Sequence, residues 1–130
     1  MIRVLVVDDH PIVRQGLVGV LSDEEDLEVV GEAGSGHEAI GLMPRLRPDV
    51  VLLDLEMDDI DGIEAIPQVL AASPSTGILV FTAYDTDERV LGAIRAGARG
   101  YMLKGASADD IARGIRRIAE IGRTSCRERV

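Results

Sequence analysis

Short apolar runs alternate with longer amphipathic segments along most of the chain. The runs have the length of strands, and the segments between them have the length of helices. This alternation is typical of repeated strand–helix units that form a parallel sheet. The pattern predicts strands at residues 2–7, 27–33, 50–53, 77–82 and 100–103.

The segments that follow the strands carry apolar residues at helical spacing. The predicted helices run from Pro11 through Ser22, over residues 36–45, about 63–72 and about 86–96, and over a last stretch after Ser107. Pro67 suits only the first turn of a helix, which leaves the start of the third helix open. The residues expected to face the sheet are Val13, Leu17, Val20, Leu21, Ala39, Met43, Leu46, Val90, Leu91, Ile94, Ile111, Ile115 and Ile118.

The strand–helix pattern ends near residue 121. Residues 1–121 have the size of one ordinary domain, which can bury a core without disulfides or structural metal. Residues 122–130 are polar, contain several arginines and lack apolar periodicity. We expect this segment to be disordered, and to be either the start of a linker to a further domain or residues contributed by an expression vector.

Composition narrows the classes of function. The chain has 14 basic and 23 acidic residues and a formal charge of −9, which argues against direct nucleic-acid binding, because that needs cationic side chains on phosphates. Cys126 is the single cysteine, so no internal disulfide or thiolate metal site can form. No apolar stretch approaches the roughly 20 residues that span a bilayer. We expect a soluble, cytoplasmic protein without a membrane partner.

Polar residues directly follow four of the apolar runs. Asp8 and Asp9 follow the first run, Asp54 the third, Thr82 the fourth and Lys104 the fifth. Because the carboxyl ends of parallel strands share one edge of the sheet, these side chains should meet in one pocket. Three neighbouring carboxylates repel one another, so the pocket favours a hard divalent cation, and Mg²⁺ is the best candidate.

The same set of groups suits phosphoryl transfer. Asp54 is the expected nucleophile, since carboxylates form acyl phosphates and Asp54 ends the strand predicted beside the first one. Lys104 supplies positive charge for the transferred oxygens, and Thr82 can donate its hydroxyl to them once they arrive. Singly, each residue also fits a turn, a helix cap or a solvated loop. Their joint occurrence at four strand ends favours a shared site.

A second motif competes with this interpretation. Residues 34–39 match the glycine pattern of a dinucleotide-binding turn and lie about 20 residues before Asp54. A dinucleotide site would leave the other strand-end residues unexplained, and small residues here also let a helix begin tightly. His10 and His37 lack a second histidine or cysteine at ligand spacing, and we expect both at the surface.

Several segments together resemble the receiver domain of two-component response regulators. They are Val6-Val7-Asp8-Asp9-His10-Pro11, Asp54-Leu55-Glu56-Met57, Asp61-Gly62, Thr82-Ala83 and Gly100-Tyr101-Met102-Leu103-Lys104. The resemblance spans about residues 2–121 and is strongest to the LuxR/NarL/FixJ-type subfamily, whose receivers precede a helix-turn-helix domain. It implies a doubly wound, flavodoxin-like or CheY-like (βα)5 fold, an α/β fold with a five-stranded parallel sheet in the order 2-1-3-4-5.

The resemblance also implies how the site works. Asp54 would accept a phosphoryl group from the phosphohistidine of a sensor histidine kinase. Mg²⁺ would be held by Asp9, Asp54 and the backbone carbonyl of Glu56, while Asp8 would act largely through water. Where the family usually has a proline after the methionine, this chain has Asp58, which adds negative charge and flexibility beside the site.

Further positions would report and limit the signal. Thr82 and Tyr101 would form the switch: Thr82 moves toward the phosphoryl group, Tyr101 rotates inward, and Lys104 pairs with the phosphoryl group. Glu56 and Tyr84 occupy the positions that, in similar proteins, tune how easily water attacks the acyl phosphate.

A receiver of this kind is a signalling switch and not an enzyme, apart from self-phosphotransfer and slow self-dephosphorylation. Phosphorylation would change the surface made by the fourth helix, fifth strand and fifth helix, and would strengthen a homodimer through the first and fifth helices. DNA would be reached only through a C-terminal helix-turn-helix domain outside this sequence. The enzyme alternative is a small Mg²⁺-dependent phosphatase with an aspartyl intermediate, in which Glu56 would be the second acid.

Overall fold

The predicted strands pair into one parallel sheet. The computed structural model describes residues 1–83 and 86–128, and within them the sheet has five strands in the order β2–β1–β3–β4–β5. The strands are β1 (Ile2–Val7), β2 (Leu27–Ala33), β3 (Val50–Leu53), β4 (Gly77–Thr82) and β5 (Gly100–Leu103). The fold class and the strand order predicted from the sequence are confirmed.

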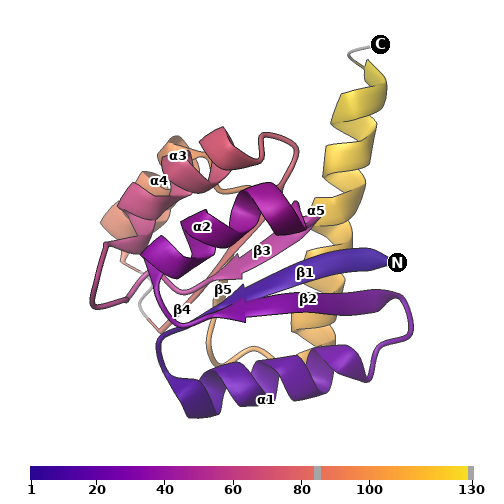
Figure 1. Cartoon of the computed structure of the whole chain (residues 1–130), viewed down its shortest axis with the longest axis horizontal. Coiled ribbons are helices and arrows are strands. Elements are labelled where there is room, and N and C mark those ends of the chain that lie inside the picture. Colours follow the sequence, from indigo (N-terminus) through magenta and orange to yellow (C-terminus); the bar gives the residue numbers. More distant parts are fainter. Residues whose placement is uncertain (84–85, 129–130) are drawn as a thin grey trace.

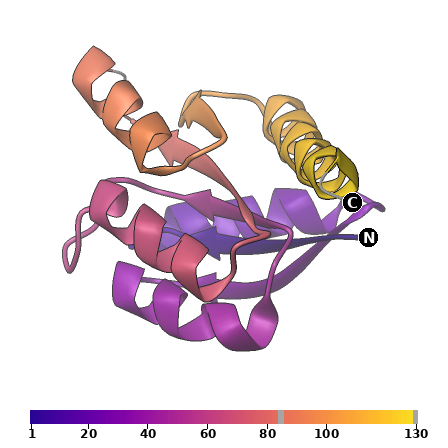
Figure 2. The same cartoon turned by 90° about the horizontal axis from the view of Figure 1, so that it is seen from above.

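Helices cover both faces of this sheet. They are α1 (Pro11–Ser22), α2 (Gly36–Leu46), α3 (Gly62–Ala72), α4 (Asp87–Ala96) and α5 (Ala108–Glu128). The helices α1 and α5 lie on one face and α2 and α3 on the other, with α4 beside α3 (Figures 1 and 2). In β1, Val4 and Val6 pack toward α1 and α5, whereas Leu5 and Val7 pack toward α2 and α3. A strand covered on both faces has no side that needs polar residues, which explains the continuous apolar run.

The register of the sheet brings the strand ends to one edge. In the ladder, Val7 is paired with Leu53, Leu53 with Val80, and Thr82 with Leu103. The ladder continues by one residue, because the amide of Asp54 donates to the Val7 carbonyl (3.0 Å) and the amide of Lys104 to the Thr82 carbonyl (2.9 Å). The side chains that follow the strands therefore project from neighbouring positions.

Polar side chains close the starts of the helices. Ser35, Asp61, Thr86 and Ser107 accept hydrogen bonds from amides in the first turns of α2, α3, α4 and α5, which satisfies donors that have no partner inside the helix. Gly97 follows α4 with a φ of 125°, a conformation that glycine adopts at little cost. The N-cap predicted at Ser107 and the glycine predicted after the fourth helix are confirmed.

Three residues expected to face the sheet are exposed instead. Val20 is 38% exposed, Leu91 51% and Ile94 45%. Val20 lies at the flank of the α1 stripe whose centre is the buried pair Leu17 and Leu21. The helix α4 packs beside α3 through the buried Ala93, so its larger apolar side chains extend past the sheet. The helical period predicts a face correctly, but it does not say whether a sheet lies under that face.

The helix α3 begins at Gly62 and contains Pro67 in its interior, so the expectation that this proline lies in the first turn is wrong. The lost backbone hydrogen bond is offset by burial on both sides of the proline, because Ala65, Ile66 and Val69 are all fully buried. The helix α2 likewise accommodates Pro44 and ends at Leu46.

The helix α5 continues to Glu128, where the sequence predicted disorder from residue 122 onward. The expectation of disorder is wrong for residues 122–128. Extending a helix that has already formed costs far less than starting one, and no proline interrupts this segment. Figure 1 shows the second half of α5 extending past the end of the sheet. The origin of residues 122–130 stays a prediction.

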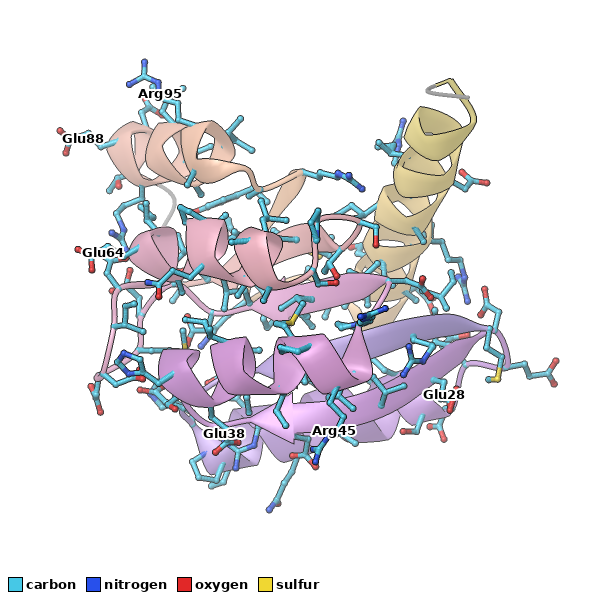
Figure 3. The ribbon with its side chains drawn as sticks, turned by 45° about the horizontal axis from the view of Figure 1, so that its top comes forward. Glu28, Glu38, Arg45, Glu64, Glu88 and Arg95 are labelled. Atoms are coloured by element: carbon cyan, nitrogen blue, oxygen red, sulfur yellow. The ribbon has the colours of Figure 1, made fainter. Side chains whose placement is uncertain are left out.

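Charged side chains cover the outer surfaces. Figure 3 shows six of them pointing away from the body of the protein: Glu28, Glu38, Arg45, Glu64, Glu88 and Arg95. Over residues 1–83 and 86–128, none of the helices combines the length and apolar character needed to cross a membrane.

Candidate functional site

Carboxylates from β1 and β3 meet at the carboxyl edge of the sheet. Asp8 and Asp54 are each 1% exposed, and the Asp9 side chain is 16% exposed. One ligand atom from each of Asp8, Asp9, His10 and Asp54 lies within 4.8 Å of the others. A group of this size can enclose a single cation. The predicted convergence of Asp8, Asp9 and Asp54 is therefore present in the structure.

Lys104 reaches this cluster from β5. Its Nζ lies 3.1 Å from Asp54 Oδ2 and 3.2 Å from Asp8 Oδ2. The Lys104 amide is fixed by its bond to the Thr82 carbonyl, so the side chain starts from a defined position. One ammonium group thus bridges two buried carboxylates that come from different strands.

The burial of the site changes the protonation equilibria of its groups. Burial raises the pKa of Asp54, although the Glu56 amide and Lys104 favour its charged form. Burial alone would lower the pKa of Lys104, but the ion pairs with Asp54 and Asp8 outweigh it and the pKa is raised. Lys104 is therefore charged at neutral pH, and it lies where it can stabilise further negative charge.

The oxygens of the cluster fit a bound cation. Among the described residues, buried Asp8 Oδ2 and Asp9 Oδ1 accept no hydrogen bond. Lys104 Nζ lies 3.2 Å from Asp8 Oδ2, and His10 Nδ1 lies 2.9 Å from Asp9 Oδ1. Each oxygen thus has one nitrogen nearby and still has capacity for a further ligand. Buried carboxylate oxygens in this condition are suitable ligands for a hard divalent ion.

A cavity of about 290 Å³ opens beside the cluster. Its lining residues are His10, Val13, Asp54, Glu56, Ala83 and Lys104. The cavity borders both the carboxylate expected to act as nucleophile and the ammonium expected to receive the phosphoryl oxygens. The site therefore has room for a small anionic group at the position where the chemistry requires it.

The loop after β3 (residues 54–61, the β3–α3 loop) starts with a tight turn. The Glu56 amide donates to Asp54 Oδ1 at 3.0 Å, so it binds the carboxylate oxygen that Lys104 does not. The Glu56 side chain is 42% exposed and points toward α4, where Arg89 binds it. The role of the Glu56 carbonyl as a metal ligand stays a prediction.

The expected switch residues occupy different environments. Thr82 is fully buried at the end of β4. Tyr101 in β5 is half-buried, pairs with Val80 of β4, and packs against the apolar core on the α2–α3 face. Their movement on phosphorylation stays a prediction. Tyr84, expected to tune dephosphorylation, lies outside the described residues.

Three residues near the site were not identified from the sequence. His10 is exposed as expected, with 62% of its side chain accessible, yet its Nδ1 contacts the carboxylates of both Asp8 and Asp9. Arg14 donates from Nη1 to the Asp8 carbonyl at 2.7 Å. Arg89 binds the β3–α3 loop. The contacts of a flexible charged side chain depend on its neighbours in the fold, which sequence periodicity does not specify. The acidic composition of the β3–α3 loop was the one sequence feature that could have indicated a basic partner such as Arg89.

The region of the competing dinucleotide motif is already occupied. The Asp59 carboxylate accepts hydrogen bonds from the amides of Gly36 (3.0 Å) and His37 (2.9 Å), which begin α2. A Cβ placed on Gly36 would lie 2.1 Å from a methyl carbon of Ile60. The donors that would hold a pyrophosphate are therefore bound by a carboxylate of the same chain, and the loop covers the glycine.

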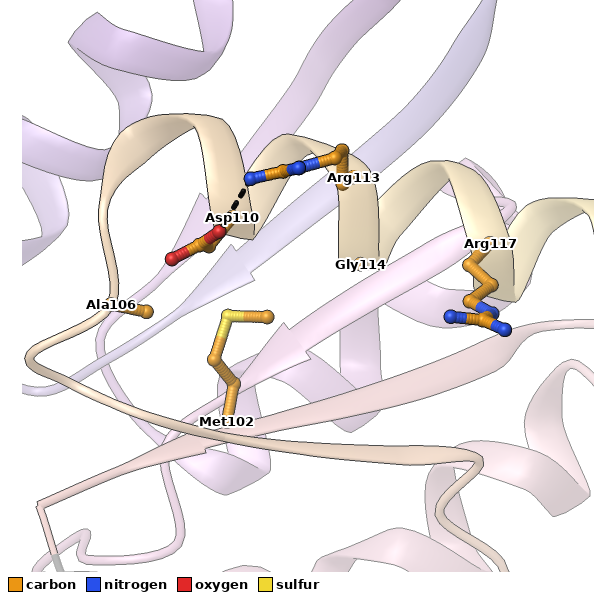
Figure 4. Close-up of a pocket in the computed structure, with 6 residues that line it drawn as sticks. All are labelled: Met102, Ala106, Asp110, Arg113, Gly114 and Arg117. Atoms are coloured by element: carbon orange, nitrogen blue, oxygen red, sulfur yellow. Dashed lines mark hydrogen bonds and ion pairs between the residues drawn. The ribbon is translucent and has the colours of Figure 1, made fainter.

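A larger cavity lies between β5 and α5 (Figure 4). It measures about 450 Å³ and is lined by Met102, Ala106, Asp110, Arg113, Gly114 and Arg117. Asp110 is bound by Arg113 at 2.7 Å, so the carboxylate in this cavity is already paired. None of the strand-end site residues borders it, and we assign it no part in the phosphoryl site.

Comparisons with known proteins agree with the geometry. The family model of the response regulator receiver domain matches residues 4–116. The chain is 47% identical to response regulator protein VraR of Staphylococcus aureus over 116 residues, which are 89% of this chain and 56% of VraR. It is 44% identical to the DNA-binding transcriptional activator DevR/DosR of Mycobacterium tuberculosis over 116 residues, which are 89% of this chain and 54% of that protein. The chain thus spans about half the length of these curated relatives.

A solved structure shows the same likeness in three dimensions. The signal receiver domain of the response regulator NarL from Mycobacterium tuberculosis superposes with a TM-score of 0.87 at 36% sequence identity. The superposition covers 92% of this chain and 96% of that domain. Unlike VraR and DevR/DosR, this domain is matched over nearly its whole length.

Proposed function

Because the chain belongs to the response regulator receiver domain family, we propose that Asp54 accepts a phosphoryl group and that this event changes the surface the domain presents. The chain is the receiver domain of a two-component response regulator of the LuxR/NarL type. Such domains are phosphorylated by sensor histidine kinases. The observation that carries the proposal is the position of Asp54, buried, 3.1 Å from Lys104 and beside a cavity.

The proposed reaction uses groups that the chain holds in place. A carboxylate oxygen of Asp54 bonds to the phosphorus of a phosphohistidine while the phosphorus–nitrogen bond breaks. The imidazole is the leaving group and stays on the kinase without its phosphoryl group. Lys104 then pairs with the phosphoryl oxygens. The Glu56 amide donates to Asp54 Oδ1, and this hydrogen bond holds the carboxylate in one orientation.

Receiver domains bind Mg²⁺ at an acidic pocket, and we propose that this pocket does so. Asp9, Asp54 and the Glu56 carbonyl would hold the ion, with Asp8 acting through water. When bound, Mg²⁺ supplies positive charge that lets a phosphoryl group approach three carboxylates. The buried oxygens of Asp8 and Asp9 that accept no hydrogen bond support this assignment.

We propose that Thr82 and Tyr101 transmit the event. Thr82 would move toward the phosphoryl group and Tyr101 would rotate into the space it leaves. The Thr82 carbonyl accepts a hydrogen bond from the Lys104 amide, so the two residues are direct neighbours at the edge, which supports a joint response. The surface that changes would be formed by α4, β5 and α5.

The remaining proposals concern the cellular compartment of the protein and its binding partners. We propose a cytoplasmic protein whose phosphorylation strengthens a homodimer through α1 and α5, and which reaches DNA only through a C-terminal segment outside this sequence. The length of the curated relatives supports a longer regulator, since the chain covers 56% of VraR and 54% of DevR/DosR. The name of DevR/DosR states that it binds DNA.

We also propose that the domain does not turn over phosphate esters repeatedly. A phosphatase of the aspartyl type would need Glu56 as a mobile second acid. In the structure Arg89 Nη2 binds Glu56 Oε1 at 2.9 Å, on the side of α4. Repeated hydrolysis of a phosphate ester, followed by phosphate release, would favour the phosphatase instead.

The test of phosphoryl transfer is incubation with acetyl phosphate and Mg²⁺ followed by intact-mass measurement. The unaltered chain should gain one phosphoryl group, and Asp54→Asn should gain none. Asp58→Asn is the matched control, since Asp58 is an exposed carboxylate in the same loop. An adduct that persists in Asp54→Asn would show that the acceptor is another residue.

A further inference from the structure

Arg89, in the first turn of α4, holds both ends of the β3–α3 loop. Its Nη2 donates to Glu56 Oε1 at 2.9 Å. Its Nη1 and Nη2 donate to the two oxygens of Asp61 at 3.0 and 3.2 Å. The planar guanidinium thus binds one carboxylate with both arms and a second carboxylate with one of them, a pattern that a lysine cannot reproduce.

The Arg89 side of these contacts is shielded from solvent. The Arg89 side chain is only 26% exposed, although Glu56 and Asp61 are 42% and 43% exposed. The hydrogen bonds that Arg89 donates to Asp61 raise the pKa of Arg89, and burial opposes this only in part. The Asp61 carboxylate also accepts from the Ile63 amide at 3.0 Å and so begins α3. Arg89 therefore joins α4 to the start of α3 as well as to the loop.

Glu56 is fixed at both its backbone and its side chain. Its amide binds the phosphoacceptor Asp54, and its carboxylate binds Arg89. Glu56 also lines the cavity that contains Asp54 and Lys104. If Arg89 were absent, the Glu56 carboxylate would be free to turn from α4 toward that cavity, because the remaining contact holds only its backbone.

We propose that Arg89 is a positioning residue that prolongs the phosphorylated state by holding the Glu56 carboxylate away from the acyl phosphate. The inference rests on the proposed phosphorylation of Asp54. In hydrolysis, a water oxygen bonds to phosphorus while the bond from phosphorus to the Asp54 oxygen breaks, so that carboxylate and inorganic phosphate are the products. A released Glu56 carboxylate can orient this water and take its proton before passing it to solvent.

The test measures the loss of the phosphoryl group from purified protein. The chain and its variants are phosphorylated with acetyl phosphate and Mg²⁺, freed of the donor by desalting, and followed by intact mass. Arg89→Ala should hydrolyse about three- to tenfold faster than the unaltered chain. Arg89→Lys should lie between the two, because a lysine can bind one of the carboxylates but not both.

The controls separate positioning from a general loosening of α4. Arg95→Ala removes an exposed arginine from the last turn of the same helix, where it points outward in Figure 3, and should leave the hydrolysis rate unchanged. In a Glu56→Gln background, Arg89→Ala should have little further effect, because the amide is a poor base. Acceleration that persists in Glu56→Gln would mean that Arg89 does not act through Glu56, and the inference would be wrong.

The outcomes also separate this inference from the function it rests on. If the unaltered chain takes up no phosphoryl group, the proposed function and this inference both fail. If the chain is phosphorylated at Asp54 but Arg89→Ala keeps the original lifetime, only the inference fails. Faster hydrolysis in Arg89→Ala that disappears with Glu56→Gln supports it.

Discussion

At the residue scale, Lys104 determines the charge of the site. It is the only lysine in the chain, while the other basic residues are arginines. Its compact ammonium fits between Asp8 and Asp54, at 3.2 and 3.1 Å, where a guanidinium would need more room. With Asp9, the three carboxylates and one ammonium leave two negative charges, which a single Mg²⁺ can neutralise. This charge balance indicates a divalent cation. The oxygens of Asp8 and Asp9 that accept no hydrogen bond indicate the same ion.

Replacing Lys104 should destabilise the protein most when metal is removed. In EDTA, Lys104→Met should lower the free energy of unfolding by about 1–3 kcal/mol, because buried Asp8 and Asp54 lose their cation. In Mg²⁺ the loss should be smaller, since the ion supplies positive charge to the same oxygens. Urea unfolding of both proteins in EDTA and in Mg²⁺ measures the difference. An equal loss in the two conditions would contradict the assignment of the metal to this cluster.

Asp59 should make stability depend on acid pH. Hydrogen bonding from the amides of His37 and Gly36 lowers its pKa from 3.8 to about 2 in the folded chain. A depressed carboxyl pKa stabilises the fold above the unfolded value of 3.8, and this stabilisation is lost as the pH falls through about 2. Asp59→Asn should therefore be less stable than the unaltered chain at pH 7, and the gap should close toward pH 2.

Urea midpoints at several pH values between 7 and 2 measure this gap. At neutral pH we expect a loss of about 0.5–2 kcal/mol, the usual size for a carboxylate that caps a helix start. Asp58→Asn alters the exposed neighbouring carboxylate and should change stability by less than about 0.5 kcal/mol. A difference between Asp59→Asn and the unaltered chain that stays constant with pH would show that the charge of Asp59 is not responsible.

At the element scale, α4 is attached more lightly than the other helices of its face. Its buried side chain is Ala93, and Leu91 and Ile94 are largely exposed. Thr86 and Gly97 close its ends, and Arg89 joins it to the β3–α3 loop. A helix with little buried apolar area opens at low free energy, which suits an element that must change its position.

Hydrogen exchange should show this difference directly. We expect amides of α4 to exchange faster than those of α3, which buries Ala65, Ile66 and Val69. Exchange followed by mass spectrometry on the unaltered chain resolves the two helices as separate peptides. Arg89→Ala should speed exchange in α4 further, while leaving β3 unchanged. Equal protection of α3 and α4 would mean that the exposed side chains of α4 do not reflect weaker attachment.

The sequence predicted the strands and their ends more reliably than the helix surfaces. A strand buried on both faces is apolar throughout, so the residue where polarity begins, such as Asp8 or Asp54, marks the edge of the sheet. The helical period in α4 predicted that Leu91 and Ile94 face inward. The period carries no information on where the helix lies, and α4 lies beside α3 instead of over the sheet. The contacts of Arg89 depend on this same placement, and local pattern could not predict them.

At the scale of the whole molecule, acidic residues gather both beside the site and at the turn after α1. The formal charge is −9, and the β3–α3 loop contributes much acidity beside the site. On the other face, Arg116 of α5 binds Asp26 at 2.7 Å and Glu24 at 3.2 Å, which ties α5 to the turn after α1. The two helices proposed to form the homodimer are thus held together within one chain. A displacement of either helix would therefore change the surface that α1 and α5 form together.

The homodimer is tested by sedimentation velocity with and without beryllofluoride and Mg²⁺. Beryllofluoride imitates the phosphoryl group on Asp54, and we expect it to increase the weight-average mass. Val20 in α1 and Ile121 in α5 are 38% and 44% exposed, and a dimer through these helices would cover them. The pair Val20→Asp and Ile121→Asp should therefore reduce association about tenfold or more, because a charge buried at an interface is costly. Leu91→Asp, on the exposed side of α4, is the matched control and should associate normally; dissociation by Leu91→Asp alone would place the dimer on α4 instead.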